Sequence, residues 1–96
     1  MSVYIVAHIK IENREEYARY EAGFLEIFAK YEGELLAVSD EPQVIEGEWP
    51  YTRAVILRFP DADEARRWYE SPEYQALAKH RWEASEGTIV SLAGFG

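Results

Sequence analysis

Cysteine is absent from the 96 residues of this sequence. Its absence excludes a disulfide framework and a thiolate metal site, and it is compatible with the cytoplasmic location that we expect. Long apolar runs are also missing, since none approaches the roughly 20 residues that a membrane-spanning helix needs. The first residues lack the basic region and apolar run of a secretory signal peptide. We therefore expect no signal peptide and no membrane span.

Basic residues are scarce. Lys and Arg number 10 against 18 Asp and Glu, which gives a formal net charge of −8. Nucleic-acid binding depends on basic side chains that release counterions from phosphates, and docking on an anionic membrane surface also needs basic residues. We therefore expect neither partner, and we interpret the acidic excess as the charge that keeps a small protein in solution.

The sequence does contain ample material for a hydrophobic core. Hydrophobic residues make up 48% of the chain and aromatic residues 15%. The length predicts a single domain over residues 1–96. Because a chain of this length buries only roughly 60–65% of the surface that its unfolded form exposes, a partner subunit would stabilise it further.

Hydrophobic periodicity predicts two helical regions among four strands. Asn13 and Glu16 form a capping-box pair ahead of an aromatic stripe with helical spacing. We expect Gly33 to close this first helix in the left-handed conformation. Asp61 caps the second helical region. Runs with strand character occupy residues 3–11, 35–38, 53–59 and 88–93.

The second helical region breaks and restarts at a defined point. Ser71 and Pro72 follow Tyr69, and a serine before a proline suits a cap followed by the first helical position. We expect this last helix to end at Gly87 and Trp68 to be buried. The resulting order is strand, helix, strand, strand, helix, strand. It predicts an α+β fold, a ferredoxin-like βαββαβ sandwich with an antiparallel sheet and the helices on one face.

The sheet face without helices carries an excess of apolar residues. An exposed antiparallel face should be polar, and an apolar area of this kind usually marks an interaction surface. We expect two such faces to pack against each other, which would form a homodimeric α/β barrel. The alternative is a modestly apolar face in contact with solvent. The predicted interface residues are Tyr4, Val6, His8, Ala54 and Ile56.

These features coincide with a family pattern. The segment Trp68-Tyr69-Glu70-Ser71-Pro72-Glu73-Tyr74 is its most specific part. The supporting residues are Tyr17, Tyr20, Glu46-Gly47-Glu48-Trp49-Pro50, Arg53, Arg58-Phe59-Pro60, Arg81 and Gly94. The chain resembles, over nearly its whole length, the family catalogued as domain of unknown function 1330, within the dimeric α/β-barrel superfamily. The resemblance implies the fold and a dimer, and it implies no activity.

Five residues are candidates for a ligand pocket between the helices and the sheet. His80 could act as a general base near neutral pH, or it could have a surface or packing role. Arg53 and Arg81 could clamp a carboxylate, or pair structurally with Glu46 or another acid. Tyr69 could line the pocket or belong to the core. Trp49 could close the pocket mouth or cover the partner subunit.

Three functions remain open on this basis. The first is a homodimer that binds a small anionic or aromatic molecule, with cofactor-independent chemistry of a monooxygenase or isomerase type. The second is a non-catalytic structural or regulatory interaction module whose aromatic residues are all core. The third, a metal- or haem-dependent enzyme, has the least support, because two histidines without ligand spacing predict no metal site. We therefore expect no cofactor.

Overall fold

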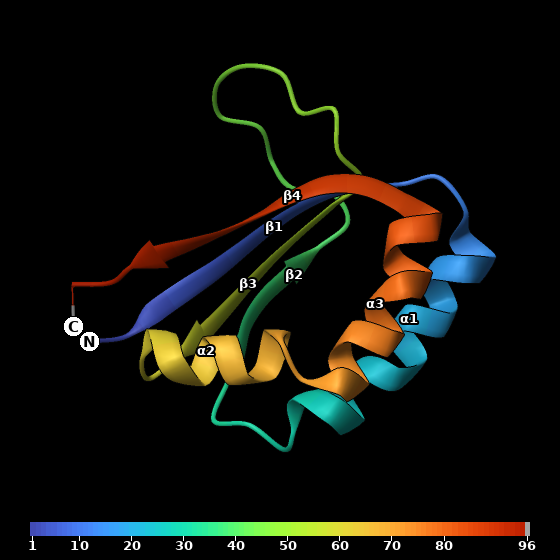
Figure 1. Cartoon of the computed structure of the whole chain (residues 1–96). Coiled ribbons are helices and arrows are strands. Elements are labelled where there is room, and N and C mark those ends of the chain that lie inside the picture. Colours follow the sequence, from blue (N-terminus) through green and yellow to red (C-terminus); the bar gives the residue numbers. More distant parts are fainter. Residues whose placement is uncertain (96) are drawn as a thin grey trace.

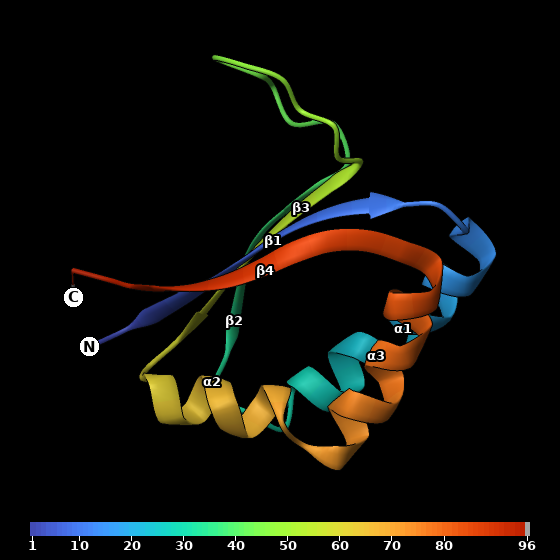
Figure 2. The same cartoon turned by 45° about the horizontal axis from the view of Figure 1, so that its top comes forward.

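The computed structural model describes residues 1–95, which form four strands and three helices in the order β1-α1-β2-β3-α2-α3-β4. The helices are α1 (Arg14–Phe28), α2 (Ala62–Tyr69) and α3 (Pro72–Ala84). The strands are β1 (Val3–Ile11), β2 (Glu34–Ser39), β3 (Arg53–Phe59) and β4 (Ser85–Ala93). All helices lie on one side of the sheet (Figures 1 and 2). The predicted ferredoxin-like α+β fold is confirmed.

The sheet is antiparallel, with the strand order β2-β3-β1-β4. In β1, Val3, Ile5, Ala7 and Ile9 are buried, whereas the residues between them are only partly buried. This alternation follows from the pleat, because successive side chains of a strand point to opposite faces. The odd-numbered residues of β1 and β3 therefore face the helices and form the floor of the core.

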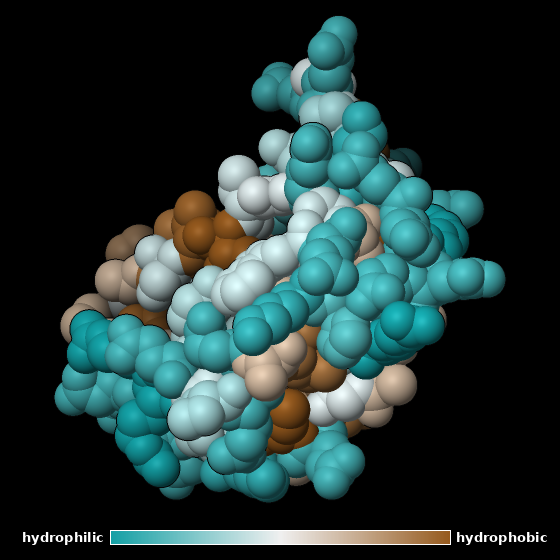
Figure 3. All heavy atoms as spheres, turned by 45° about the vertical axis from the view of Figure 1, so that its right-hand side comes forward, coloured by the Kyte–Doolittle hydropathy of each residue, from teal (hydrophilic) through white to brown (hydrophobic). Residues whose placement is uncertain are grey.

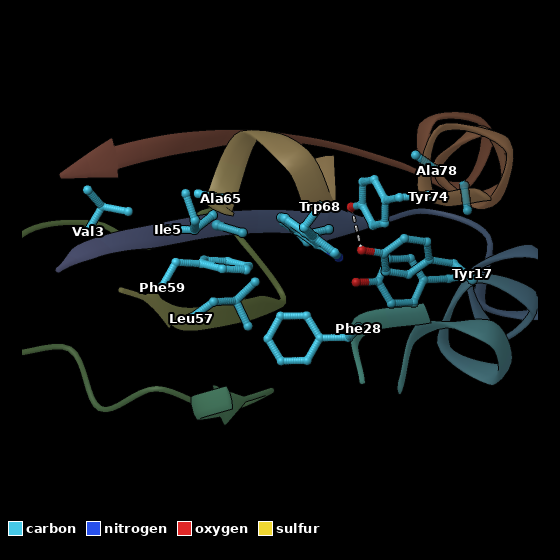
Figure 4. Close-up of a cluster of buried hydrophobic side chains, with 14 residues drawn as sticks. Val3, Ile5, Tyr17, Phe28, Leu57, Phe59, Ala65, Trp68, Tyr74 and Ala78 are labelled. Carbon is cyan, nitrogen blue, oxygen red and sulfur yellow. Dashed lines mark hydrogen bonds between the residues drawn. The ribbon is translucent and has the colours of Figure 1, made fainter. Parts of the chain in front are cut away.

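An aromatic cluster fills the space between this floor and the helices. Trp68 of α2 is 2% exposed, and its ring centroid lies 4.4 Å from that of Tyr74 and 5.4 Å from that of Phe59. Phe28 meets Trp68 edge to face at 5.8 Å. Figure 4 shows Trp68 at the centre of this cluster, between the strand residues and the tyrosines of the helices. The expected burial of Trp68 is confirmed.

The helix starts are capped as the sequence predicts. The Asn13 side chain accepts a hydrogen bond from the backbone N–H of Glu16 at 3.1 Å, and Asp61 caps α2 in the same way. The Ser71 hydroxyl accepts from the backbone N–H of Tyr74 at 3.1 Å and donates to the Trp68 carbonyl at 2.9 Å. Ser71 thus joins the end of α2 to the start of α3, which fixes the angle between them.

Two predicted helix ends are wrong, and both involve glycine. Helix α1 ends at Phe28, and Gly33 does not adopt a positive φ. Its lack of a side chain serves packing, since a Cβ there would lie 2.5 Å from the Phe28 ring. Helix α3 ends at Ala84, and Gly87 lies within β4, where a Cβ would meet the His8 carbonyl oxygen at 2.2 Å. Both glycines allow close approach instead of closing a helix.

The sheet face opposite the helices carries the predicted interface residues. Val90 and Leu92 of β4 add to it, since they pair with Val6 and Tyr4 and are 48% and 51% exposed. The segment between β2 and β3 projects from the end of the sheet where β2 ends and β3 begins (Figures 1 and 2). By contrast, the side of the molecule that includes α1 and α3 is mostly hydrophilic, with hydrophobic residues in separate small areas (Figure 3).

Candidate functional site

A cavity of about 210 Å³ lies between the helix-facing side of the sheet and the helices. Its walls are mainly apolar. The apolar and aromatic lining residues include Ile5, Ala7, Ile9, Phe24, Val55, Leu57, Trp68 and Ile89. The polar groups are few, namely three tyrosines, two arginines and one glutamate. A concave apolar space with a few polar groups is the usual form of a small-molecule site.

The cavity opens between α1 and the edge strand β2. Leu25 of α1 and Leu35 and Val38 of β2 line it and are 62%, 44% and 42% exposed, which identifies them as its rim. The β2–β3 register shifts between Leu35 and Ala37, so that Leu35 pairs with Leu57 and Val38 with Val55. This bulge directs both rim residues to the helix-facing side of the sheet.

Arg53 lies in the cavity wall but is already ion-paired. Its guanidinium donates to Asp40 at 2.7 Å and lies 3.1 Å from a Glu21 carboxylate oxygen. The same guanidinium lies 5.8 Å from the centroid of the Tyr17 ring. The sequence left open whether Arg53 has a structural partner, and the structure supplies two acids in place of Glu46. Its charge is therefore compensated within the chain.

Arg81 of α3 is the second arginine of the cavity and is buried, at 8% exposed. Its Nε and Nη2 atoms are buried and have no hydrogen-bond partner within residues 1–95. Aromatic rings lie beside it, with the Tyr20 centroid 5.7 Å and the Trp82 centroid 6.0 Å from its guanidinium carbon. These rings favour a cation, and the Tyr74 hydroxyl also interacts with the guanidinium, but Nε and Nη2 have no charged acceptor among residues 1–95.

Three tyrosines contribute hydroxyls to the same cavity. The hydroxyls of Tyr20 and Tyr74 are hydrogen-bonded at 2.7 Å, as the dashed line in Figure 4 shows. Burial raises the pKa of Tyr17 to about 12 and raises the pKa values of Tyr20 and Tyr74 as well. All three hydroxyls therefore stay protonated and neutral near neutral pH.

His80 makes a different contact. Its Nδ1 is hydrogen-bonded to the Glu16 carboxylate of α1, a partner that the sequence did not identify. The hydrogen bond with His80 holds the pKa of Glu16 below its usual value. A carboxylate that orients an imidazole is a familiar arrangement in catalysis, but His80 does not line the cavity.

Comparisons with known proteins place the chain in a family. The family model described as "Domain of unknown function (DUF1330)" matches residues 2–95. The chain belongs to this family. No curated protein matches the sequence.

Solved structures share the fold of this DUF1330 member. A protein of unknown function from Rhodopseudomonas palustris has a TM-score of 0.81 at 15% identity, over 99% of this chain and 83% of that one. A dimeric ferredoxin-like protein of unknown function from Thermobifida fusca has a TM-score of 0.73 at 15% identity, over 98% and 92%. SnoaB from Streptomyces nogalater, a cofactor-independent oxygenase, has a TM-score of 0.72 at 16% identity, over 99% and 94%. At these identities the likeness shows the fold alone.

The predicted pocket residues of this DUF1330 chain do not converge on one cavity. Arg53 and Arg81 both line it, whereas Tyr69 lines adjoining hollows and His80 reaches Glu16. Trp49 packs against His8, with the ring centroids 4.7 Å apart. His8 projects from the sheet face opposite the cavity. The expected border of Trp49, Arg53, Tyr69 and His80 is therefore wrong as a single pocket, because Trp49 lies against the opposite sheet face and His80 turns from α3 toward Glu16 of α1.

Sequence reasoning missed the tyrosines as a polar group of the site. Tyr17 and Tyr20 lie in the aromatic stripe predicted for the first helix, and Tyr74 lies in the segment that carries the family pattern. The available signal was the choice of tyrosine over phenylalanine at buried helix positions, since a buried hydroxyl needs a hydrogen-bond partner.

Two further predictions concern features that the chain should lack. Among residues 1–95, no three His, Cys, Asp or Glu side chains are grouped so that they could hold a metal ion. In the same part of the chain, no helix combines the length and apolar character needed to cross a membrane.

Proposed function

We propose that this protein is a homodimer that binds one small molecule in the cavity of each subunit. The cavity itself carries the proposal, because its apolar walls enclose a buried arginine and neutral hydroxyls, and because it opens to solvent between α1 and β2. An engineered apolar cavity of about 150 Å³ in another protein binds benzene. The cavity of about 210 Å³ in this chain therefore suits one aromatic ring with a substituent.

Ligand binding is tested by filling the cavity from its floor. Ala7 of β1 is 6% exposed and lines the cavity, so Ala7→Leu should occupy part of the ligand volume. The matched control is Ala76→Leu, the same change at an exposed position of α3 outside the cavity. A thermal-shift panel of single-ring acids, amides and phenols should find stabilisers of the wild type and the control. Stabilisation that Ala7→Leu leaves unchanged would place the ligand elsewhere.

The dimer rests on the open face of the sheet. Tyr4, Val6 and Ile56 lie there beside the more exposed Val90 and Leu92, which makes a contiguous apolar surface. Neighbours from Thermobifida fusca and Bacteroides fragilis with this fold are described as dimeric. Two such faces would bury more than about 1,000 Å² in total, the size of a stable interface.

Sedimentation equilibrium tests the dimer. The wild type and an Ala76→Asp control should be dimeric at micromolar concentration, whereas Val6→Asp should shift the equilibrium to monomer. The reason is that an unpaired carboxylate in the interface has to be desolvated. A monomeric wild type would contradict the proposal.

The reaction class to assay first is oxygenase chemistry without a cofactor, because the neighbour SnoaB is described as a cofactor-independent oxygenase. The predicted proton-transfer role of His80 stays a prediction, and the cavity gives it no support.

A non-catalytic interaction module is the second candidate. The segment between β2 and β3 favours it, because Ile45 is 93% exposed and Val44 is 49% exposed on a projecting loop. Ile45→Ser together with Val44→Ser should leave the thermal-shift response intact if the cavity is the functional site. A wild type without any stabiliser in the panel would favour the interaction module.

A further inference from the structure

The cavity holds a buried positive charge that nothing in the described chain neutralises. Arg81 is 8% exposed, and no carboxylate of residues 1–95 lies within ion-pair distance of its guanidinium. A buried cation without a counter-charge is strongly unfavourable, so buried arginines are normally paired. The missing acceptor is therefore the main electrostatic feature of this site.

The neighbouring groups cannot supply the missing charge. Glu21 lines the cavity, but its carboxylate pairs with Arg53. Glu86 lines the hollow on the other side of Arg81 and makes no ion pair with it. The adjacent tyrosines keep their protons because burial raises their pKa values. Their hydroxyls polarise the site without neutralising it.

The same groups form a set of convergent donors. The guanidinium has two buried N–H-bearing atoms without partners, Nε and Nη2. In the Tyr20–Tyr74 pair one hydroxyl donates to the other, which leaves the accepting hydroxyl with a proton of its own to donate. Arginine presents its donors in a planar fork that matches the two oxygens of a carboxylate. Residues 1–95 therefore offer donors for a carboxylate and no charged acceptor for them.

From this arrangement we infer that Arg81 is the anchor for the carboxylate of a small aromatic acid. The inference rests on the proposed ligand cavity and specifies its ligand class. Arg81 lies beside Ile9 and Ile89 of β1 and β4, whereas the rim residues Leu35 and Val38 belong to β2, at the other edge of the sheet. The carboxylate would thus be innermost, and the ring would lie among the apolar walls toward the mouth.

The cavity contents favour an aromatic acid over an inorganic anion. A volume of about 210 Å³ exceeds what a small inorganic anion needs, and most of the lining would offer such an anion no donors. A ring would instead contact Phe24, Val55 and Leu57 along the walls. The second arginine does not compete for the carboxylate, because Arg53 already has two acidic partners.

Calorimetric titration with matched probes tests the inference. Benzoate and phenylacetate carry the carboxylate, and benzamide and phenylacetamide are their neutral counterparts of similar shape. The wild-type dimer should bind each acid at least about tenfold more tightly than its amide, the ratio expected for charge-assisted hydrogen bonds. Arg81→Met keeps the length and apolar stem of the side chain, and it should abolish this preference while it still binds the amides.

Arg14→Met is the matched control. It makes the same change at an exposed position of α1 that does not line the cavity, so it should keep the acid preference. Apo Arg81→Met should unfold at the same or a higher temperature than the wild type, because it removes an uncompensated buried charge. Loss of the preference in Arg14→Met, or its retention in Arg81→Met, would overturn the assignment.

The proposed ligand cavity and the proposed carboxylate anchor would be refuted by different results. A wild type that binds acids and amides equally would refute the carboxylate anchor and leave the ligand cavity standing. A wild type that binds none of the four probes would refute the cavity as a binding site, and the anchor with it. Amide binding that persists in Arg81→Met with no acid preference is the result that supports both.

Discussion

Removal of the Trp68 ring should be the most destabilising single truncation in the core. The side chain is 2% exposed and packs against Phe28, Phe59 and Tyr74. A tryptophan buries up to about 250 Å², which at about 25 cal/mol per Å² gives an upper limit of about 6 kcal/mol. Measured truncations of buried Phe and Trp to Ala lie lower, at about 3–5 kcal/mol.

One feature of Trp68 reduces the stability that its truncation should cost. Its indole Nε1 is buried and has no hydrogen-bond partner within residues 1–95. An unsatisfied buried donor costs about 1–3 kcal/mol, and truncation relieves that cost. We therefore expect Trp68→Ala to lower the free energy of unfolding by about 3 kcal/mol. Trp68→Phe, which also removes the N–H but keeps a ring, should cost clearly less.

Urea unfolding followed by far-ultraviolet circular dichroism measures the difference. All variants should be compared at one protein concentration, because the stability of a dimer depends on it. Trp82→Ala is the matched control, since Trp82 is 47% exposed and its removal should cost less than about 1 kcal/mol. Equal stabilities of Trp68→Ala and the wild type would refute the assignment of this ring to the core and point to a role in ligand contact.

Three other perturbations test separate parts of the fold. Ser71→Ala should cost about 1 kcal/mol in urea unfolding, because it removes the cap of α3, and Ser71→Asn should restore part of it. Gly33→Ala should lower the melting temperature by an amount equivalent to about 1–3 kcal/mol, since the new methyl group would overlap the Phe28 and Phe59 rings; an unchanged melting temperature would contradict the close packing. Stability should fall between about pH 10 and pH 12, because burial raises the pKa of Tyr17 from 10.0 to about 12 and the unfolded chain releases that proton first. Tyrosinate absorbance during an alkaline titration measures this, and ionisation of all tyrosines at the ordinary pKa without unfolding would contradict it.

Local signals in the sequence were sufficient for most of the fold. Ser71 and Pro72 specify the helix restart through groups that lie within three residues of each other, and the alternation in β1 specifies which residues face the core. Gly33 and Gly87 were misinterpreted because glycine suits both a left-handed helix end and a close approach of another segment. Only the tertiary structure, which brings Phe28 or the His8 carbonyl to these positions, distinguishes the two.

The candidate site was less predictable, because its features depend on residues far apart in the sequence. The partner of His80 is Glu16, 64 positions earlier, and the partners of Arg53 come from α1 and from the residue after β2. The sequence could mark Arg81 as a cationic candidate. It could not show that no acid of residues 1–95 reaches this arginine, because that depends on where their carboxylates lie in the folded chain.

The strand order also determines when the sheet can form while the chain is being synthesised. β1, the first strand made, lies between β3 and β4 and pairs with β4 from Val3 opposite Ala93 to Ile11 opposite Ser85. Such long-range pairing slows folding, because a large loop has to close before the contacts form. A nascent chain on the ribosome therefore exposes one side of β1 until residues 85–93 have emerged. Ile89 of this last strand and Arg81 of α3 also line the cavity. The cavity is therefore complete, and able to bind a ligand, only after β4 has paired with β1.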